Sequence, residues 1–336
     1  MSAADTRLAT ATGTPVGPAD VLAAAERIAP HVRHTPLLRC DSLPGLPGLP
    51  GPSDPPGLLV KAEHLQHSGS FKLRGAANAM LALGADEVVA GSSGNHGIAV
   101  ATLGRTLGIR VTVVMAAGAA ESKELAIRAL GGRVLRVPGG VAERDRYAKE
   151  FAARTGSALV PSSDHPLVIA GQGTVGLEVF RDAPELDAIF VPVGGGGLLA
   201  GVCLAAAHLP RPVRVIGVEP ERTRRYARSV AAGRPVELPP SDTVADGLRG
   251  QRPGELILPI VRHRVDELIG VDDAAVLRAM DLLHRAGIAA EPSGAAALAG
   301  ALRSGTLRSG TPGRSAVVVS GGNSAAVLAA ATAAAR

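Results

Sequence analysis

From about residue 58 onward, the chain alternates short runs rich in β-branched residues with longer runs rich in alanine. Eight short runs precede or follow helix-like segments: LLVKAEHL, DEVVAGS, RVTVVMA, GRVLRV, SALVP, DAIFVPV, VRVIGVE and SAVVVSGG. Strands that alternate with helices favour parallel sheets covered by helices. The sequence therefore predicts an α/β fold, and ligand sites are expected in the loops at the carboxyl ends of the strands.

Two segments fall outside this alternation. Residues 1–18 are rich in Thr, Ala, Gly and Pro, which predicts a disordered N-terminal tail. The run LPGLPGLPGPSDPPG at 43–57 contains too much proline and glycine for a helix or strand and is typical of a surface insertion. No uninterrupted apolar run reaches membrane-spanning length and no signal-peptide core follows a basic start, so we expect a cytoplasmic protein without a membrane partner.

The composition argues against several function classes. The formal net charge is +5, but aromatic residues make up only 2% of the chain, so a nucleic acid would find few stacking platforms and we expect no such partner. Cys40 and Cys203 lie far apart and match no zinc or redox spacing. The HExxH and Gly-x-Ser-x-Gly patterns of common metalloproteases and serine hydrolases do not occur.

Lys72 stands in an unusual place. The stretch SGSFKLRGAANAM predicts a helix with Ser70 as N-cap, which puts Lys72 in the first turn, where the helix dipole disfavours a cation. Only four of the 35 Lys and Arg residues are lysines. Lys123 and Lys149 each neighbour a glutamate in sequence and are predicted on the surface, which is also one interpretation of Lys61, two residues before Glu63. An unpaired amine near a positive dipole has a lowered pKa, which makes it a nucleophile; an ordinary exposed lysine is the alternative.

Four consecutive glycines lie between a predicted strand and a predicted helix in VPVGGGGLLAGV. They are Gly194, Gly195, Gly196 and Gly197. Backbone N–H groups there can approach an anion freely, and the helix start adds a positive dipole, so we expect a phosphate. A purely structural turn is one alternative. Another is a nicotinamide or flavin dinucleotide site with Glu219 binding the ribose, although the glycines do not match G-x-G-x-x-G and Lys72 would have no role.

Two further loops carry polar residues at strand ends. GSSGNHGIAVA brings Ser92, Ser93, Asn95 and His96 to a predicted helix start, a suitable cradle for a carboxylate or a ring oxygen. Serines that cap the helix and a histidine that only packs are the structural alternative. VVVSGGNS places Ser320 at the carboxyl edge of a buried strand. An amine nucleophile, a phosphate loop and two polar loops together indicate a pyridoxal phosphate site.

The motifs SGSFKLRGAAN, SSGNHG, AGQGT, VPVGGGGLLAGV, ADGL, EPSG and VVSGGN occur in that order. In this order they resemble the pyridoxal-phosphate-dependent serine/threonine dehydratase and serine racemase family, over about residues 20 to 330. The resemblance implies the tryptophan-synthase-β-like fold (fold type II), with two domains that each hold an open, mostly parallel sheet. Residues 19–86 and 165–336 would form the large cofactor-binding domain, and residues 87–164 a small mobile domain that closes over the substrate. A homodimer is also expected.

The same resemblance implies roles for the cofactor residues. Lys72 is similar to the Schiff-base lysine, which also acts as general base, and Phe71 to the residue that flanks the ring. Asn95 matches the asparagine that bonds the ring hydroxyl, and the four glycines match the phosphate cup. Ser320 matches the partner of the pyridine nitrogen; unlike an aspartate, it need not protonate that nitrogen, which suits β-elimination better than transamination.

The implied substrate is an amino acid. Its carboxylate would be surrounded by Ser92, Asn95 and His96, with Arg144 nearby. The implied reaction is elimination of water from L-threonine, L-serine or a related β-hydroxy amino acid, which yields a 2-oxo acid and ammonia. Serine racemisation with elimination as a side reaction is the alternative, because Ser93 is the racemase-type residue. A NAD-dependent oxidoreductase is the alternative from another class.

The resemblance breaks down at a cation site. Racemase-like relatives bind a divalent cation through a Glu and an Asp a few residues apart. Glu219 matches the first of these, but Arg225 stands where the second carboxylate belongs. Hard cations need oxygen ligands and a guanidinium repels them, so we expect no metal, with Glu219 as the one possible ligand, and weak or absent dependence on Mg²⁺.

Overall fold

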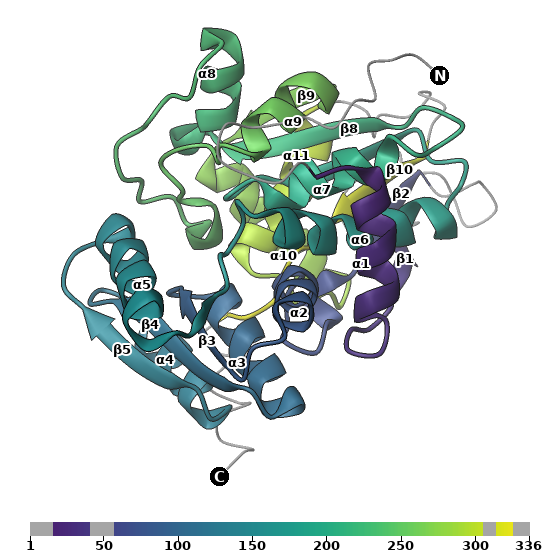
Figure 1. Ribbon diagram of the computed structural model, residues 1–336. Helices are drawn as coiled ribbons and strands as arrows, with labels where there is room; N and C mark the ends of the chain where they lie inside the picture. The colour runs from purple at the N-terminus through teal and green to yellow at the C-terminus, as the bar shows by residue number, and fades with distance from the viewer. Residues whose placement is uncertain (1–15, 41–56, 305–313, 325–336) are drawn as a thin grey trace.

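Two separate β-sheets organise the residues that the computed structural model describes, which are 16–40, 57–304 and 314–324 (Figure 1). Within these ranges the larger sheet has six strands in the order β1–β2–β10–β7–β8–β9, and the smaller has four in the order β5–β4–β3–β6. Only the described β1–β2 pair is antiparallel. The strands are β1 (Leu37–Arg39), β2 (Leu58–Lys61), β3 (Glu87–Gly91), β4 (Arg110–Ala116), β5 (Arg133–Val137), β6 (Ala158–Leu159), β7 (Ala188–Pro192), β8 (Arg214–Pro220), β9 (Glu267–Val271) and β10 (Ser315–Val318).

Each of the eight predicted strand segments contains a strand, so the α/β fold with mostly parallel sheets is confirmed. The sequence pattern does not predict β1, which has three residues directly after Pro36, or β9, which is as short as the predicted strand β3. The four-stranded sheet uses strands from residues 87–159. The domain boundaries at 86/87 and 164/165 stay a prediction. The predicted tail lies outside the described residues except for 16–18, and the Pro-rich insertion lies outside them except for Gly57.

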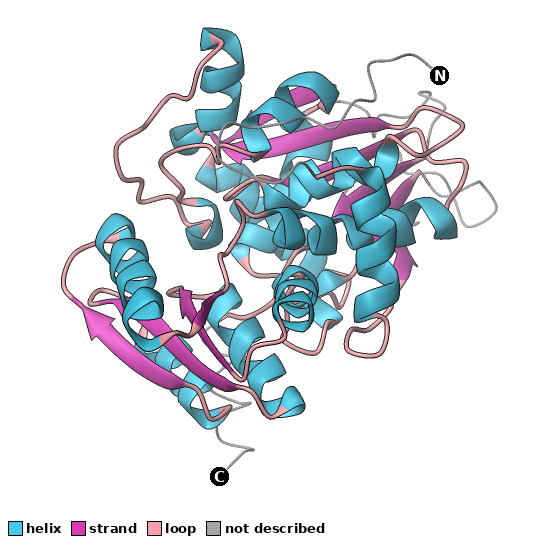
Figure 2. Cartoon of the chain, viewed as in Figure 1, coloured by secondary structure: helices cyan, strands magenta, loops and turns pink. Residues whose placement is uncertain are grey.

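Helices cover both faces of each sheet, as Figure 2 shows. Side chains alternate along β7: Ile189 and Val191 pack in one core cluster, whereas Ala188 and Phe190 pack in another on the opposite face. The first cluster lies under α1 (Pro18–Ile28), α6 (Pro166–Asp182), α7 (Gly197–Ala206) and α9 (Ile257–Arg264). The second lies under α10 (Asp273–Arg285) and α11 (Pro292–Arg303).

The smaller sheet is covered in the same way. One face packs with α2 (Lys72–Leu83), α3 (Asn95–Leu107) and α4 (Glu121–Ala129), and the other with α5 (Val141–Thr155). The remaining described α-helix, α8 (Arg225–Ala232), follows β8 after the short 3-10 turn η3 (Glu221–Thr223). Within the described parts of the chain, no helix is both long and apolar enough to span a membrane.

Glycines bring three helices into close contact. A Cβ added at Gly171 of α6 would lie 2.6 Å from the carbonyl oxygen of Arg74 and 2.8 Å from the Cα of Gly75, both on α2. A Cβ added at Gly201 of α7 would lie 2.4 Å from the backbone nitrogen of Gly173, also on α6. The AGQGT motif is therefore a packing surface. It holds α2, which begins at Lys72, and α7, which begins at the glycine loop, against one common helix.

A buried cluster of charges ties α2 to its surroundings. Arg74 of α2 pairs with Glu178 of α6 at 2.6 Å and with Glu63 of the 3-10 turn η2 (Glu63–Leu65) at 2.7 Å. Lys61 pairs with the same Glu178 at 2.5 Å, and the side chains of Lys61, Glu63 and Arg74 are fully buried. Two cations thus balance two carboxylates. A surface position for Lys61, one interpretation of its sequence context, is excluded by this burial; its partner lies 117 residues away in sequence.

Arg74→Met should lower the free energy of unfolding by about 3–5 kcal/mol, since it leaves buried carboxylates without their main partner. Urea-induced unfolding of the cofactor-free protein measures the change. Arg110→Met is the control: its side chain is 73% exposed and pairs with Glu87 at 3.3 Å, so it should cost less than about 1 kcal/mol. Equal losses in the two variants would contradict a stabilising role for the buried cluster.

Candidate active site

Four strand-end loops and the start of α2 meet at one place. The N–H of Phe71 donates to the carbonyl of Ser320, after β10, at 3.0 Å. The amine of Lys72 donates to the carbonyl of Ser162, after β6, at 2.6 Å. Asn95, which follows β3, accepts a hydrogen bond from Asn323 at 3.0 Å. The glycine loop after β7 joins them, because Ser163 packs against Gly195. The sequence-predicted loops therefore converge, together with the 160–165 loop.

The amine of Lys72 lies in a desolvated and positively charged environment. Its Nζ is 5.2 Å from the centre of the Phe71 ring, and no carboxylate of a described residue pairs with it. Burial, followed by the guanidinium of Arg144, lowers the pKa of Lys72 to about 8. A substantial fraction of the amine is therefore neutral and nucleophilic near pH 8.

The helix that carries Lys72 is capped differently from the prediction. α2 begins at Lys72, so the lysine does lie in the first turn. The residue before the helix is Phe71, however, and among the described residues the buried Oγ of Ser70 has no hydrogen-bond partner. Ser70 as N-cap is therefore wrong, because Ser70 instead forms a backbone bridge with Gly321.

The glycine loop has no room for side chains. A Cβ at Gly195 would lie 2.4 Å from the Oγ of Ser163, and one at Gly194 would lie 2.6 Å from the carbonyl of Gly247. Gly196 has a φ of 89°, in the left-handed region that favours glycine. For Gly195 and Gly196, no hydrogen-bond acceptor in the described chain contacts the backbone N–H. Unobstructed N–H groups at the start of α7 are suited to bind an anion.

The same contacts connect the glycine loop with Lys72. Ser162 accepts the lysine amine, and the next residue, Ser163, packs against Gly195 and Gly197. Two consecutive residues therefore set the position of the nucleophile relative to the anion site. The sequence interpretation does not include them, although polar residues directly after the predicted strand SALVP are the signal that identified the other loops.

The serines of the SSGNHG loop have different environments. The buried Oγ of Ser92 accepts hydrogen bonds from the N–H groups of Gly94 and Gly97, at 3.2 and 2.9 Å, so Ser92 caps α3. The half-buried Ser93 is not a cap, because its Oγ accepts from the N–H of Ala116 at the end of β4, at 3.3 Å. The alternative that both serines are caps is correct only for Ser92.

His96 is held neutral. Its Nε2 donates to the carbonyl of Val160 at 2.9 Å, which leaves Nδ1 as an acceptor. Burial, followed by the charge of Lys72, lowers the pKa of His96 to about 3. Its Nδ1 is buried and has no partner in the described part of the chain. His96 is therefore not simply a packing residue with all its hydrogen bonds formed, because its Nδ1 can still accept a hydrogen bond from a ligand.

Asn95 belongs to a buried polar network. Its Nδ2 donates to Glu291 at 2.6 Å, and its Oδ1 accepts from Asn323. Burial, followed by the negative charge of Asp246, raises the pKa of Glu291 to about 7. The second hydrogen of the Asn95 amide has no partner among the described residues, so it is available for a ligand. The sequence interpretation assigns Glu291 no role in the site, although this residue stands in the quoted EPSG motif.

Ser320 and Arg144 complete the predicted set. Ser320 is buried at the end of β10, and its Oγ contacts no hydrogen-bond partner within residues 16–40, 57–304 and 314–324. Arg144 of α5 has a side chain 11% exposed and pairs with Asp145 at 2.7 Å. The positive charge of Arg144 contributes to lowering the pKa of both Lys72 and His96, so Arg144 lies beside the site.

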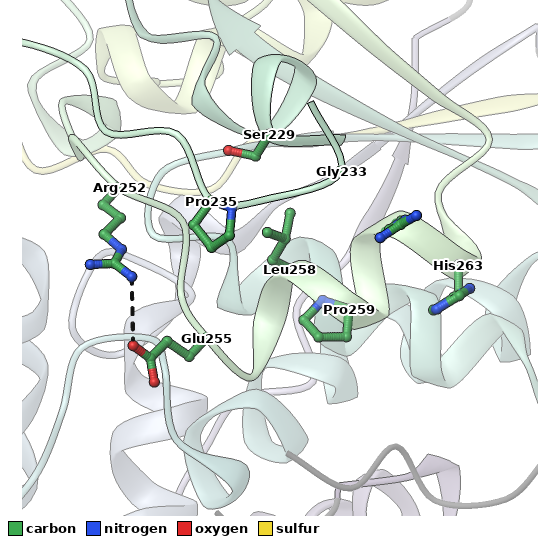
Figure 3. A pocket seen from close by; sticks show the side chains of 9 residues that line it. Ser229, Gly233, Pro235, Arg252, Glu255, Leu258, Pro259 and His263 are labelled. Carbon is green, nitrogen blue, oxygen red and sulfur yellow. Dashed lines mark ion pairs between the residues drawn. The ribbon is translucent and has the colours of Figure 1, made fainter. Parts of the chain in front are cut away.

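A separate surface pocket of about 330 Å³ lies near α8 and α9 (Figure 3). Its lining includes Ser229, Pro235, Leu258 and His263, and Arg252 pairs with a glutamate at its rim at 3.7 Å. It contains none of the sequence-predicted site residues. The candidate active site is therefore the convergence of loops around Lys72.

The residues present fit pyridoxal phosphate. Lys72 offers an unpaired amine to the aldehyde, and the glycine loop offers backbone N–H groups that a side chain would block. The hydroxyl of Ser320 and the second amide hydrogen of Asn95 are unused polar groups, as is the Nδ1 of His96. Glu219, which a dinucleotide would need for its ribose, instead accepts the N–H groups of Tyr226 and Ala227, each at 3.0 Å.

Comparisons with known proteins agree with this fit. The family model described as "pyridoxal-phosphate dependent enzyme" matches residues 28–321. The serine racemase of Oryza sativa subsp. indica is 39% identical over 308 residues, which cover 89% of this chain and 88% of that protein. The L-threo-3-hydroxyaspartate ammonia-lyase of Saccharomyces cerevisiae is 37% identical, with 84% and 86% covered. The crystal structure of a threonine deaminase from T.th. has a TM-score of 0.79 and 41% identity, with 91% and 98% covered.

The lowered pKa of Lys72 predicts unusual reactivity in the cofactor-free protein. An amine-specific reagent should modify Lys72 with a rate that rises through a midpoint near pH 8, because only the neutral amine reacts and the pKa is about 8. Mass spectrometry of the Lys72 peptide across a pH series measures this. A free lysine analogue, with a pKa of about 10.4, is the control. A midpoint for Lys72 above pH 10 would contradict the description of its environment.

Proposed function

Because this chain belongs to the family of pyridoxal-phosphate dependent enzymes, we propose that it eliminates water from L-threonine, L-serine or a related β-hydroxy amino acid. The products would be a 2-oxo acid and ammonia. The family resemblance and the cofactor predicted from the motifs are confirmed. The NAD-dependent alternative is set aside, since pyridoxal phosphate is the cofactor and both oxygens of Glu219 are engaged.

The single observation that carries the proposal is the environment of the Lys72 amine. It is desolvated, has no carboxylate partner among the described residues, and is connected to the glycine loop through Ser162 and Ser163. A lysine in this setting would hold the aldehyde carbon of the cofactor, while the N–H groups of Gly195 and Gly196 bind its phosphate. A lysine with only a surface role needs neither a lowered pKa nor a neighbouring anion site. The two properties together therefore support a role for Lys72 in holding the cofactor.

Pyridoxal phosphate, when bound, supplies an electrophile for the substrate amine and a ring that stabilises negative charge on Cα. Lys72 would accept the Cα proton, since a general base works best when its pKa lies near the working pH. Phe71 would flank the ring, Asn95 would donate to the ring hydroxyl, and Ser320 would face the pyridine nitrogen. A serine there is not an acid, so it need not protonate that nitrogen.

The start of α3 would bind the substrate carboxylate. Ser92 accepts two backbone N–H groups and donates its own hydroxyl proton to the carbonyl of Gly94 at 3.4 Å, a long hydrogen bond that a carboxylate oxygen would replace. Asn95 and His96 lie in the first turn of α3, where the helix dipole favours an anion. Arg144 adds a positive charge nearby. This assignment keeps Ser92 in the substrate site although it also caps the helix.

Closure of the small domain, residues 87–164, would exclude water during the reaction. One contact joins the 87–164 segment to the rest of the chain: Lys123 of α4 forms an ion pair with Asp246 of the 3-10 turn η4 (Asp246–Leu248). The side chain of Lys123 is only 15% exposed, so its predicted position on the surface is wrong. A cytoplasmic location and a homodimeric state stay predictions from the sequence and its family resemblance.

Racemisation is the second candidate, and Ser93 favours it. A racemase needs a second acid or base on the face opposite Lys72. The Oγ of Ser93 accepts a single backbone hydrogen bond, from Ala116, so its proton is free to be donated. Relatives named serine racemase and relatives named ammonia-lyase both match this chain over most of its length. Ser93 therefore provides the experimental distinction between the two activities.

The wild-type holoenzyme should release a 2-oxo acid from at least one L-β-hydroxy amino acid in a panel of serine, threonine and 3-hydroxyaspartate. The chirality of the remaining substrate is followed in parallel. Ser93→Ala should spare elimination from the L-substrate and lower racemisation by at least roughly 100-fold, the usual contribution of an acid–base group. The two rates separate because elimination needs only Lys72.

Thr102→Ala is the matched control for this variant. It removes a hydroxyl from α3 that bonds only to the carbonyl of Ile98, at 2.8 Å, and should change neither rate. Equal losses of elimination and racemisation in Ser93→Ala, together with a lowered melting temperature, would reduce Ser93 to a structural role. Release of no 2-oxo acid from any member of the panel, without racemisation, would refute the proposed function.

A further inference from the structure

A buried arginine without a carboxylate partner lies behind the glycine loop. Arg225, the first residue of α8, is 0% exposed. Its guanidinium donates to the carbonyls of Thr223 at 3.1 Å, Leu248 at 3.3 Å and Val193 at 3.5 Å, and most closely to that of Gly194. Among the described residues it forms no ion pair. A buried charge is costly unless other groups compensate it, and here backbone dipoles do so.

These carbonyls come from three irregular segments. Val193 and Gly194 follow β7, Thr223 lies in η3, and Leu248 ends η4. The fit is close, because a Cβ added at Gly250 would lie 3.1 Å from the guanidinium carbon. The ring of Tyr226, 5.6 Å away, adds a cation–π contact. The guanidinium therefore joins segments that no regular secondary structure connects.

The next residue of α8 also holds the glycine loop. The hydroxyl of Tyr226 donates to the carbonyl of Gly195 at 2.7 Å and accepts from the N–H of Gly254 at 3.1 Å. Arg225 and Tyr226 thus bind two successive carbonyls of the loop, those of Gly194 and Gly195. Both residues are anchored, since Glu219 accepts the N–H groups at the start of α8.

The orientation of the anion-binding groups follows from this arrangement. In a trans peptide the carbonyl and the following N–H point in opposite directions, and the described residues contain no cis peptide. With the carbonyl of Gly194 held by Arg225, the N–H of Gly195 points away from the arginine. The carbonyl of Gly195, held by Tyr226, directs the N–H of Gly196 in the same way. Neither of these two N–H groups has an acceptor in the described structure.

The divalent cation implied by the family resemblance does not fit here. A hard cation would need several oxygen ligands, but both oxygens of Glu219 are used by α8, and a guanidinium occupies the nearby carbonyl oxygens. No group of three or more His, Cys, Asp or Glu residues in the described ranges could hold a metal ion.

We propose that Arg225 is an internal cation that takes the place of a bound metal ion. Its guanidinium holds the carbonyl side of the glycine loop, so that the N–H side is fixed for the phosphate of the cofactor. Arg225 is a positioning residue, because it acts through Gly194 and not on the substrate. The inference rests on the proposed function only in assigning that phosphate to pyridoxal phosphate.

The test measures the affinity of the cofactor-free protein for pyridoxal phosphate by spectroscopic titration. The wild-type Kd should be unchanged by EDTA or by Mg²⁺. Arg225→Ala should raise the Kd at least tenfold, and millimolar guanidinium should restore much of the affinity, whereas urea, of similar shape but neutral, should not. Arg228→Ala removes an exposed arginine from the same helix and is the control, with the wild-type Kd expected.

Arg225→Asp provides a second arm. It replaces the guanidinium with a carboxylate near the carbonyls of Thr223 and Leu248, which the guanidinium no longer occupies. Carboxylate and carbonyl oxygens are ligands that hard cations prefer. Its affinity for pyridoxal phosphate should be low in EDTA and should recover at least fivefold with Mg²⁺ or Mn²⁺. A variant that is merely destabilised would show no such selective recovery.

Three results would overturn the proposal. They are a wild-type Kd that rises on treatment with EDTA, an Arg225→Ala protein with the wild-type Kd, and a weakened variant that neither guanidinium nor a divalent cation restores.

If Arg225→Ala fails to fold, Arg225→Lys decides between the outcomes, because it keeps the charge but cannot span four carbonyls. A raised Kd with intact circular dichroism supports the proposal, and an unchanged Kd refutes it. Failure of the proposed function would appear separately, as absent turnover with intact cofactor binding.

Discussion

The close packing of α6 against α2 and α7 is the constraint on which the candidate site depends. Gly171 lets α2 approach to backbone contact, and Gly173 does the same for α7. Arg74 and Glu178 add a buried ion pair between α2 and α6. Since α2 begins at the nucleophilic lysine and α7 begins at the anion-binding loop, one helix sets the distance between the two. Any larger residue at these glycines would move one partner relative to the other.

The titratable groups of the site share one property, which follows from their burial. The amine of Lys72, the imidazole of His96 and the carboxyl of Glu291 all have pKa values shifted towards the neutral form, with burial as the largest cause. A site in which burial opposes charge on these groups, edged by Arg144 and two helix starts, suits a ligand that brings its own negative charges. A phosphate and a carboxylate are such charges.

The sequence predicts the fold well because strand and helix periodicity are local. It also predicts Lys72, the four glycines and the SSGNHG loop, because each follows a strand or opens a helix. It fails where a residue's partner lies far along the chain. Lys61 and Lys123 have glutamates beside them in sequence, but their partners are Glu178 and Asp246, which only the fold brings near. Ser162 and Glu291 differ from these lysines, since Ser162 follows the predicted strand SALVP and Glu291 stands in the EPSG motif. Their roles nevertheless depend on contacts across the site, with Lys72 and with Asn95.

The proposed attachment point of pyridoxal phosphate is the amine of Lys72. The most direct measurement is reduction of the holoenzyme with borohydride, followed by digestion and mass spectrometry of the peptides. One phosphopyridoxyl group per chain on Lys72, with Lys61, Lys123 and Lys149 unmodified, is the result that this account predicts. A label spread over several lysines, or a protein that holds the cofactor without any label on Lys72, would contradict it.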